Sequence, residues 1–349
     1  MPYKTLTASR NTALPLALAI ILGADSAAHA QENFFQGKTI TIAVGAAAGG
    51  GLDTYARLIA RHIGKHIPGA PSVAVANMPG AGGQIAARHV YAAAAKDGTY
   101  MATFFPSVLI NPLLGAGQGP IDPSRFQYIG NARAEVSVCV VRSDVRVKTL
   151  ADLRNMDVEI GATTPGSQVV DYPVVESRLL GIRLKVTSGY KGTREIAAAI
   201  EKGEVQGICG IGWTSIKVQY PDITTAGSKF RVLMQEDSKG DPELNAAGVP
   251  LLTSLTATAE ERGVLDLLYA QNLLARPYVA PPETPGDRVA ILRAAFMRAA
   301  ADAELQAEAQ KMRIEVSGTS GADMQKIVAD MYAAPKPVVE RLAELLKQK

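Results

Sequence analysis

The sequence predicts an α/β protein of two lobes, and three observations support this prediction. The chain has 349 residues, which is long for one hydrophobic core and comfortable for two lobes of ordinary size. Short β-branched runs alternate with stretches of helical periodicity, as in a parallel sheet covered by helices. A second series of the same kind begins near residue 136, after the first has ended.

The first predicted lobe comprises residues 31–135, and its strands and helices alternate. Asp97 and Gly98 form the turn that introduces its third strand. We expect strands at 39–44, 73–76 and 100–104 and helices at 53–66 and 84–95.

The second predicted lobe comprises residues 136–235. Thr149 and Asp152 form a capping-box pattern that opens a short helix, and Gly181 and Gly203 each follow a longer one. We expect strands at 136–141, 159–162, 184–187, 205–209 and 231–234 and helices at 169–180 and 193–202.

Residues 236–349 are expected to return to the first lobe. Thr284, Pro285 and Asp287 give an N-terminal signal for a helix that ends near 300, with Thr284 as its cap. Ser320 and Asp323 repeat the capping pattern. The remaining expected elements are a strand at 273–280 and helices at 324–331 and 337–347.

A chain that forms one lobe, then a second, and then returns to the first must cross between the lobes twice. We therefore expect two crossover strands and a cleft between the lobes. We place the crossings near 133–141 and 231–240, and expect the lobes to rotate about them.

The composition is that of a globular protein. Apolar residues make up 47% and charged residues 20%, which excludes a disordered chain. Aromatic residues make up only 5%, so we expect a core of Ala, Val, Ile and Leu. The net charge of +3 is small and dispersed, which excludes nucleic acid as a partner and gives no basic membrane-binding stripe.

Residues 1–30 have the pattern of a cleaved signal peptide. Lys4 and Arg10 form a basic start, an apolar run covers 12–23, and Ala28 and Ala30 are small residues that a signal peptidase recognises. The run is too short for a bilayer core of about 30 Å, although a membrane anchor is the alternative. We expect export to the periplasm.

The mature chain contains two cysteines, Cys139 and Cys209, both in apolar strand-like runs. Export permits a disulfide between them. Two buried free thiols are the alternative, because the spacing of their Cα atoms cannot be read from a sequence.

Two glycine-rich loops follow strands of the first lobe. They are Gly49-Gly50-Gly51-Leu52-Asp53 and Asn77-Met78-Pro79-Gly80-Ala81-Gly82-Gly83. Glycines let the backbone approach a ligand, and the helix that follows presents free N–H groups and a partial positive charge. Two such loops at one sheet edge predict an anion site, and a carboxylate is the simplest ligand where no Arg is committed. Tight turns without a ligand are the alternative for either loop alone.

Neither loop fits a nucleotide site. Residues 45–50 do not match G-x-G-x-x-G, and no Lys-Ser/Thr pair follows the glycines as a P-loop requires. We therefore expect no cofactor.

Residues with hydroxyl groups also lie in loops that follow strands or precede helices in other parts of the chain. Ser107 follows the third strand, and the segments 163–167 and 189–193 precede helices of the second lobe. Thr193 is as readily a helix cap as a ligand contact.

The segments GGGLD, NMPGAGG, INPLL, TTPGS, GYKGT and VAPPETP, in this order, resemble the substrate-binding receptors of tripartite tricarboxylate transporters, the Bug family. The resemblance extends from about Lys38 to the C-terminal helix, and NMPGAGG and GYKG are its most specific parts. It implies a type II periplasmic binding protein, a monomer that closes on a small carboxylate like a flytrap. It also implies transient contact with membrane transporter subunits.

The resemblance also implies the binding residues. Backbone N–H groups and water would hold one carboxylate near Gly50, Gly51, Asp53, Gly80, Ala81 and Gly82, with Ser107 beside them. Thr164, Ser167, Tyr190 and Thr193 would approach from the second lobe.

Two departures from the family pattern leave the identity of the ligand open. The first loop has AAAGGG where the family usually has a Pro, and the segment 210–215 lacks the usual Asp and Asn-Pro. Trp213 in that segment could form an aromatic wall for the ligand, or pack as an ordinary amphipathic ring.

The sequence favours a receptor over an enzyme. His62 and His66 share a helix face, but the segment lacks the Glu of H-E-x-x-H, so we expect no metal site. There is no G-x-S-x-G elbow, and nothing indicates burial of the Lys191 amine. The alternatives are a periplasmic enzyme acting on a carboxylic acid and a partner that presents its ligand to a membrane sensor.

Overall fold

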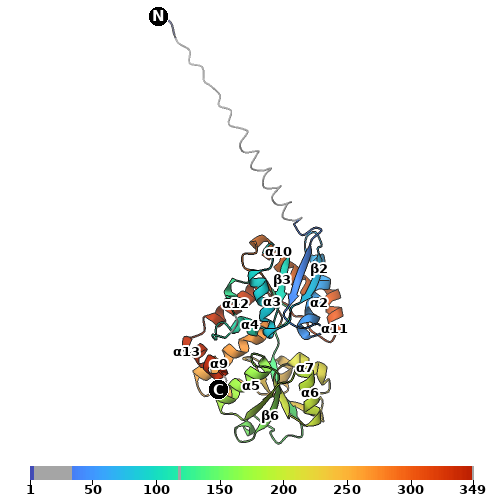
Figure 1. Cartoon of the computed structure of the whole chain (residues 1–349), viewed down its shortest axis with the longest axis vertical. Coiled ribbons are helices and arrows are strands. Elements are labelled where there is room, and N and C mark those ends of the chain that lie inside the picture. Colours follow the sequence, from blue (N-terminus) through green and yellow to red (C-terminus); the bar gives the residue numbers. More distant parts are fainter. Residues whose placement is uncertain (4–33, 117–118, 348–349) are drawn as a thin grey trace.

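The computed structural model describes residues 1–3, 34–116 and 119–347. The predicted signal peptide falls almost wholly within 4–33 and so lies outside the described residues. Within the described ranges, no helix is both long enough and apolar enough to cross a membrane. These ranges form two lobes, one above the other in Figure 1, and each lobe is built around its own sheet. The predicted two-lobed α/β fold is confirmed.

The first lobe contains a six-stranded sheet in the order β11-β4-β10-β3-β1-β2. As predicted, the three early strands are parallel, since β1 pairs in parallel with both β2 and β3. The later strand β10 lies between β3 and β4 and is antiparallel to both. The strands are β1 (Thr39–Val44), β2 (Ser72–Asn77), β3 (Tyr100–Thr103), β4 (Gln127–Asn131), β10 (Pro277–Ala280) and β11 (Thr319–Ser320).

Helices cover both faces of this sheet because its strands alternate buried apolar side chains. Ile40 and Ile42 pack with α2 and α10 in one cluster, whereas Ala43 and Ala102 pack with α3 and α12 in another. The helices are α2 (Gly51–Ile63), α3 (Gln84–Ala92), α4 (Ser107–Ile110), α10 (Gly286–Ala300), α11 (Ala303–Lys311) and α12 (Gly321–Tyr332).

The second lobe contains a five-stranded sheet in the order β7-β6-β8-β5-β9. β6 is parallel to β7 and β8, whereas β5 is antiparallel to β8 and β9. Its elements are β5 (Ser137–Arg142), β6 (Val158–Ala162), α5 (Gln168–Leu180), β7 (Leu184–Ser188), α6 (Thr193–Lys202), β8 (Gly207–Gly212), α7 (Trp213–Gln219), β9 (Phe230–Glu236) and α8 (Pro242–Ala246).

Two helices of the predicted return segment pack on the second lobe. α9 (Ala259–Tyr269) begins at a capping box formed by Thr258 and Glu261, and α13 (Lys336–Leu346) packs against α9 and α5 (Figure 1). The chain re-enters the first sheet through residues 270–276, which is later than the crossing expected near 231–240. The division into lobes at 135 and 235 remains a prediction.

Two local predictions are wrong. Of the strand expected at 273–280, only 277–280 is extended, and Leu273 and Leu274 lie in a 3-10 helix. An apolar run alone does not distinguish these two structures. Thr284 does not cap α10, because its hydroxyl donates to the carbonyl of Pro281 at 2.8 Å.

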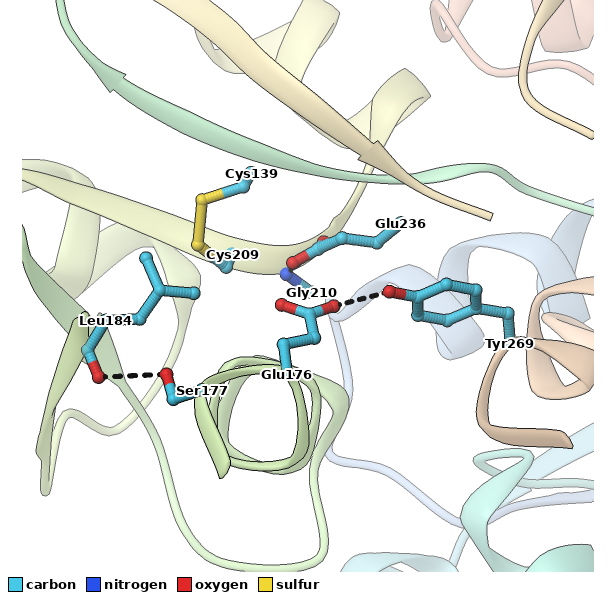
Figure 2. Close-up of a disulfide and its surroundings, with 8 residues drawn as sticks. All are labelled: Cys139, Glu176, Ser177, Leu184, Cys209, Gly210, Glu236 and Tyr269. Atoms are coloured by element: carbon cyan, nitrogen blue, oxygen red, sulfur yellow. Dashed lines mark hydrogen bonds between the residues drawn. A yellow bond between two sulfur atoms is a disulfide. The ribbon is translucent and has the colours of Figure 1, made fainter. Parts of the chain in front are cut away.

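The interior of the second lobe contains a disulfide between Cys139 on β5 and Cys209 on β8 (Figure 2). Of the two possibilities left open by the sequence, the structure therefore has the bridged one. Both residues are fully buried.

Two buried carboxyl groups, those of Glu176 and Glu236, face each other close to this disulfide (Figure 2). Glu176 accepts from the Tyr269 hydroxyl at 2.7 Å, and Glu236 from the N–H of Gly210 at 2.6 Å. Burial raises the pKa of both carboxyl groups, and the charge of Glu176 raises the pKa of Glu236 further.

Candidate functional site

Each sheet has one edge, called here its loop edge, where the carboxyl ends of its parallel strands lead into the predicted binding loops. The loop edges of the two lobes both adjoin residues 132–136, which connect β4 to β5. Because β10 is antiparallel to both β3 and β4, the carboxyl end of β4 lies at the same edge as those of β1 to β3. Because β5 is antiparallel to β8, its first residue lies at the carboxyl ends of β6 and β8. The glycine-rich loops of the first lobe and the hydroxyl-rich loops of the second therefore both adjoin this connection.

The first glycine loop is stabilised by the carboxylate of Asp53, which is only 2% exposed. This carboxylate accepts from the N–H of Gly49 at 2.8 Å, from Arg57 Nε at 2.9 Å and from Asn77 Nδ2 at 2.8 Å. Burial alone would raise the pKa of Asp53, but these hydrogen bonds lower it to about 2. Asp53 therefore orders the loop with its charge, while Gly50 and Gly51 keep exposed backbone at the start of α2.

The second glycine loop has an unusual backbone, because residues 80–83 all have positive φ. The angles are 128° at Gly80, 45° at Ala81, 61° at Gly82 and 90° at Gly83. Only glycine adopts such angles freely, which explains why three of the four residues are glycine. Gly80, Ala81 and Gly82 are exposed. The predicted binding residues of this loop therefore present accessible backbone.

The two glycine loops are joined to each other. Asn77 Nδ2, at the end of β2, also donates to the carbonyl of Ala46 at 3.0 Å, in the segment between β1 and the first loop. A Cβ added to Gly45 would lie 2.9 Å from the Cα of Gly83, so the two backbones touch. The predicted carboxylate site is thus one unit built from both loops.

Beside these loops lie a hydroxyl group and two apolar side chains. Ser107, the first residue of α4, is 8% exposed, so little of it is open to a ligand. Ile85 and Phe105 remain 41% and 43% exposed and follow the second loop and β3. This edge therefore offers backbone donors next to apolar surface.

The facing loop of the second lobe, residues 163–167, is stabilised by its own hydroxyls. Ser167 Oγ lies 2.8 Å from Thr163 Oγ1 and donates to the carbonyl of Thr164 at 2.7 Å. Gly166 N–H donates to Asp171 at 3.0 Å, and burial raises the pKa of this carboxyl group to about 6. Thr164 is exposed and Ser167 partly so, so both are accessible to a ligand.

The next loop places Tyr190 and Thr193 at the same edge. Tyr190 N–H donates to Ala162 O at 3.3 Å, so this loop adjoins the end of β6. Thr193 is the first residue of α6 rather than its cap, which is Gly192. Both side chains are partly exposed, and their contact with a ligand remains a prediction.

Trp213 is placed differently from the sequence-based expectation of an aromatic wall. Its side chain is 1% exposed and packs in the core of the second lobe with Val138 and Ile216. Its ring nitrogen donates to Glu243 at 3.2 Å. The strand β8 extends to Gly212, beyond the predicted end at 209, and the residue after it therefore starts a buried helix instead of a loop.

Several charged groups that the sequence analysis missed lie at the connection. Arg276 stacks over the ring of Tyr55, with 5.2 Å from its guanidinium carbon to the ring centre. Its Nη2 lies 3.5 Å from Glu135, whose other oxygen accepts from Thr214 N–H at 3.1 Å. Arg133 donates to Thr214 Oγ1 at 2.9 Å. The sequence gives no local indication of a role for Arg276, because its contacts Tyr55 and Glu135 are remote in the chain.

His62 of α2 and His66 of the 3-10 helix that follows it pair with acidic side chains in α11 and at its N-cap. His62 lies 2.8 Å from Glu308 and His66 lies 2.9 Å from Asp302. His62, Asp302 and Glu304 are near enough to share an ion, but Lys65 already pairs with both acids, at 2.9 Å and 2.6 Å. These contacts fasten α11 to α2, and we infer no metal site from them.

Two surface hollows of about 410 and 780 Å³ lie at the opposite edge of the second sheet. Their linings include Val158 at the start of β6 and Phe230 at the start of β9. Neither contains a residue of the loop edges, so neither belongs to the candidate site.

Solved structures of solute-binding proteins are similar over nearly the whole chain. A TctC solute-binding protein from Polaromonas is 20% identical with a TM-score of 0.64, covering 85% of this chain and 96% of that one. The fold is that of the TctC-type solute-binding proteins. MatC from Rhodopseudomonas palustris, solved with malate, is 20% identical with a TM-score of 0.64 and coverages of 90% and 100%. Another R. palustris protein, solved with adipate, is 21% identical with a TM-score of 0.65 and coverages of 88% and 97%.

A curated relative supports the same grouping from sequence. A UPF0065 protein of Agrobacterium vitis, from the TAR-I ttuE-ttuC' intergenic region, is 36% identical over 128 residues, or 36% of this chain. The match spans only 35% of that relative's length. No protein-family model matches the chain. This partial match to a UPF0065 protein and the TctC-type fold both agree with the resemblance to the Bug family that the motifs indicate.

Proposed function

We propose that the chain is an extracytoplasmic receptor that binds a small organic carboxylate between its two loop edges. It would deliver this ligand to a membrane transporter of the tripartite tricarboxylate type, without chemical change. The observation that carries the proposal is the paired glycine loop of the first lobe. Asp53 and Asn77 hold its backbone donors in place before any ligand arrives, which limits the loss of conformational freedom on binding.

Similar proteins support the carboxylate as ligand class, since two of them were solved with malate and with adipate. The first lobe would bind the carboxylate with N–H groups near Gly50, Gly51, Gly80, Ala81 and Gly82. Thr164, Ser167, Tyr190 and Thr193 would contact the rest of the molecule after the second lobe closes. Closure is favoured only by contacts that the ligand makes in the closed state.

The receptor would act in the periplasm after removal of residues 1–30. Sequencing the amino terminus of the exported protein tests this step, and an uncleaved chain in the membrane would support the alternative of an anchor.

Calorimetric titration of the mature protein with mono-, di- and tricarboxylates and aromatic acids tests the function. We expect at least one acid to bind and to raise the melting temperature, and nuclear magnetic resonance to show it unchanged after incubation. Failure of every acid to bind would contradict the receptor, and conversion of the acid would support the enzyme.

Gly80→Val tests the site. A Cβ at Gly80 would lie 2.5 Å from Ile85 Cδ1, and a φ of 128° strains any other residue. We expect affinity to fall at least about tenfold, the cost of roughly one lost charge-assisted hydrogen bond. Gly227→Val is the matched control, because Gly227 also has positive φ but has nothing within 4 Å of its Cβ position. Unchanged affinity in Gly80→Val would contradict the site.

A further inference from the structure

Arg276 lies at the first glycine loop although it comes from a distant part of the chain. It precedes Pro277 of β10, at the same edge as the carboxyl ends of β3 and β4. A Cβ on Gly51 would lie 3.6 Å from Arg276 Nη2, and Gly51 is the exposed first residue of α2. The guanidinium group is therefore next to backbone that we propose binds a carboxylate.

The contacts of this guanidinium group leave part of its hydrogen-bonding capacity unused. Nη1 donates to the carbonyl of Ala275 at 2.8 Å. Nη2 lies 3.5 Å from Glu135, which is well beyond the roughly 2.7–2.9 Å of a strong charge-assisted hydrogen bond. The side chain retains 18% exposure. Arg276 is thus a partly buried cation that is loosely paired.

Arg133 shows how a structural arginine in the same place differs. Its Nη2 donates to Thr214 at 2.9 Å, and its Nη1 forms an ion pair with Glu315. In both arginines the Nε is buried without a partner among the described residues. The difference lies in the terminal nitrogens. In Arg133 both of them have close side-chain partners, whereas in Arg276 Nη1 contacts only the carbonyl of the adjacent Ala275 and Nη2 lies 3.5 Å from Glu135.

Glu135 can give up Arg276 without being left unpaired. Its side chain is 8% exposed, and its Oε1 accepts from Thr214 N–H at 3.1 Å. A ligand carboxylate that takes the guanidinium group therefore leaves Glu135 with a partner in the second lobe. A buried carboxylate without such a partner would oppose the exchange strongly.

We infer that Arg276 binds the carboxylate of the ligand and that Glu135 is the internal carboxylate that competes for it. This inference rests on the proposed receptor function. A planar guanidinium group matches a carboxylate in two parallel hydrogen bonds, so the site selects an ionised acid against its neutral amide. The ligand class is then an anion with at least one free carboxylate, held by Arg276 together with the N–H groups of the first turn of α2.

The test compares four proteins: wild type, Arg276→Gln, Glu135→Gln and Arg133→Gln as the matched control. Each is titrated with malate, adipate and benzoate and with the corresponding amides, and the melting temperature of each is recorded. For an acid that binds wild type, Arg276→Gln should lower affinity roughly ten- to a hundredfold and remove the preference over the amide. Glu135→Gln should raise affinity by roughly two- to tenfold. Arg133→Gln should lower the melting temperature and retain the preference for the acid.

The opposite signs separate ligand binding from a structural ion pair. If the Arg276–Glu135 pair were only structural, both of its variants would weaken binding and lower the melting temperature together, which would overturn the inference. An Arg276→Gln variant that still prefers the acid would also overturn it and would leave the receptor function intact. Failure of wild type to bind any of the acids would overturn the receptor function and the inference with it.

Discussion

At the loop edge of the first lobe, Asp53 accepts from a backbone N–H, an arginine and an asparagine, whereas at the second lobe Asp171 accepts from the N–H of Gly166. The same residue type therefore has its pKa lowered to about 2 in one lobe and raised to about 6 in the other. A charged, multiply bonded group orders a loop firmly, while a desolvated group with a single backbone donor orders it weakly. Under the proposed function, we expect the first edge to be preorganised for the carboxylate and the second edge to adapt to the rest of the ligand.

The interior of the lobes shows the reverse arrangement. The second lobe contains the disulfide and the buried pair of Glu176 and Glu236 in its interior, whereas its loop 163–167 is hydrogen-bonded mainly through its own hydroxyls. We therefore expect the second lobe to be rigid in its sheet and adaptable in its loop 163–167. Three experiments test this difference between the lobes.

Removal of the disulfide should have the largest effect. The bridge spans a sequence separation of 70 residues, for which loop-closure entropy gives about 4 kcal/mol of stabilisation. The variant with Cys139→Ala and Cys209→Ala should lose about this much free energy of unfolding in a denaturant titration. The affinity for a carboxylate, measured where the variant is fully folded, should change far less than its stability. The reason is that the glycine loops belong to the other lobe. Equal stability of the variant and the oxidised wild type would contradict the rigid second sheet.

Asp53→Asn should have the next largest effect. Loss of hydrogen bonds to a charged group should lower the free energy of unfolding by about 1–3 kcal/mol at pH 7 and weaken binding. The folded pKa of about 2 is below the ordinary 3.8, so this stability is present above pH 3.8 and is lost as the pH falls towards 2. Unfolding titrations from pH 7 to pH 2 should show the two proteins converging.

The control for Asp53→Asn is Asp241→Asn. Asp241 caps α8 by accepting from Glu243 N–H, and asparagine caps a helix equally well. If the difference in free energy of unfolding between wild type and Asp53→Asn stayed constant down to pH 2, the charge of Asp53 would not be what orders the loop.

Ser167→Ala should have the smallest effect. It removes the hydroxyl bonds to Thr163 and Thr164 at a partly exposed position, which should change the free energy of unfolding by less than about 1 kcal/mol. Binding of different acids should change by different factors, because we propose that this edge contacts the variable part of the ligand. A uniform loss across all acids, as large as in Gly80→Val, would show that the two edges have the same role.

Elements with strong local signals were predictable from the sequence. The strands β1, β2 and β3 and the two glycine loops are where the patterns place them, and α5 and α6 end at Gly181 and Gly203 with left-handed backbone. The helix α9 was missed despite its capping box at Thr258 and Glu261, since no regular apolar pattern was recognised there.

The parts of the site that depend on remote contacts were not predictable. Arg276 meets Gly51, Tyr55 and Glu135, and no local pattern connects these positions. Trp213 was misplaced because glycines at 210 and 212 were interpreted as a loop, whereas both belong to β8. Gly210 has a φ of 67° at an irregularity of register, where a glycine is needed within a strand.

The position of β10 between β3 and β4 sets the order in which a newly made chain can fold. All strands of the second sheet lie within 137–236, so that sheet can form as soon as this segment is available. The first sheet must wait for residues 277–280, and until then β3 presents an open edge and β4 has none of its neighbours, which are β10 and β11. Open strand edges promote aggregation, and contacts between remote segments form slowly. The sheet of the lobe that we propose binds the carboxylate is therefore completed after the sheet of the other lobe, and its strand edges stay open for longer in the nascent chain.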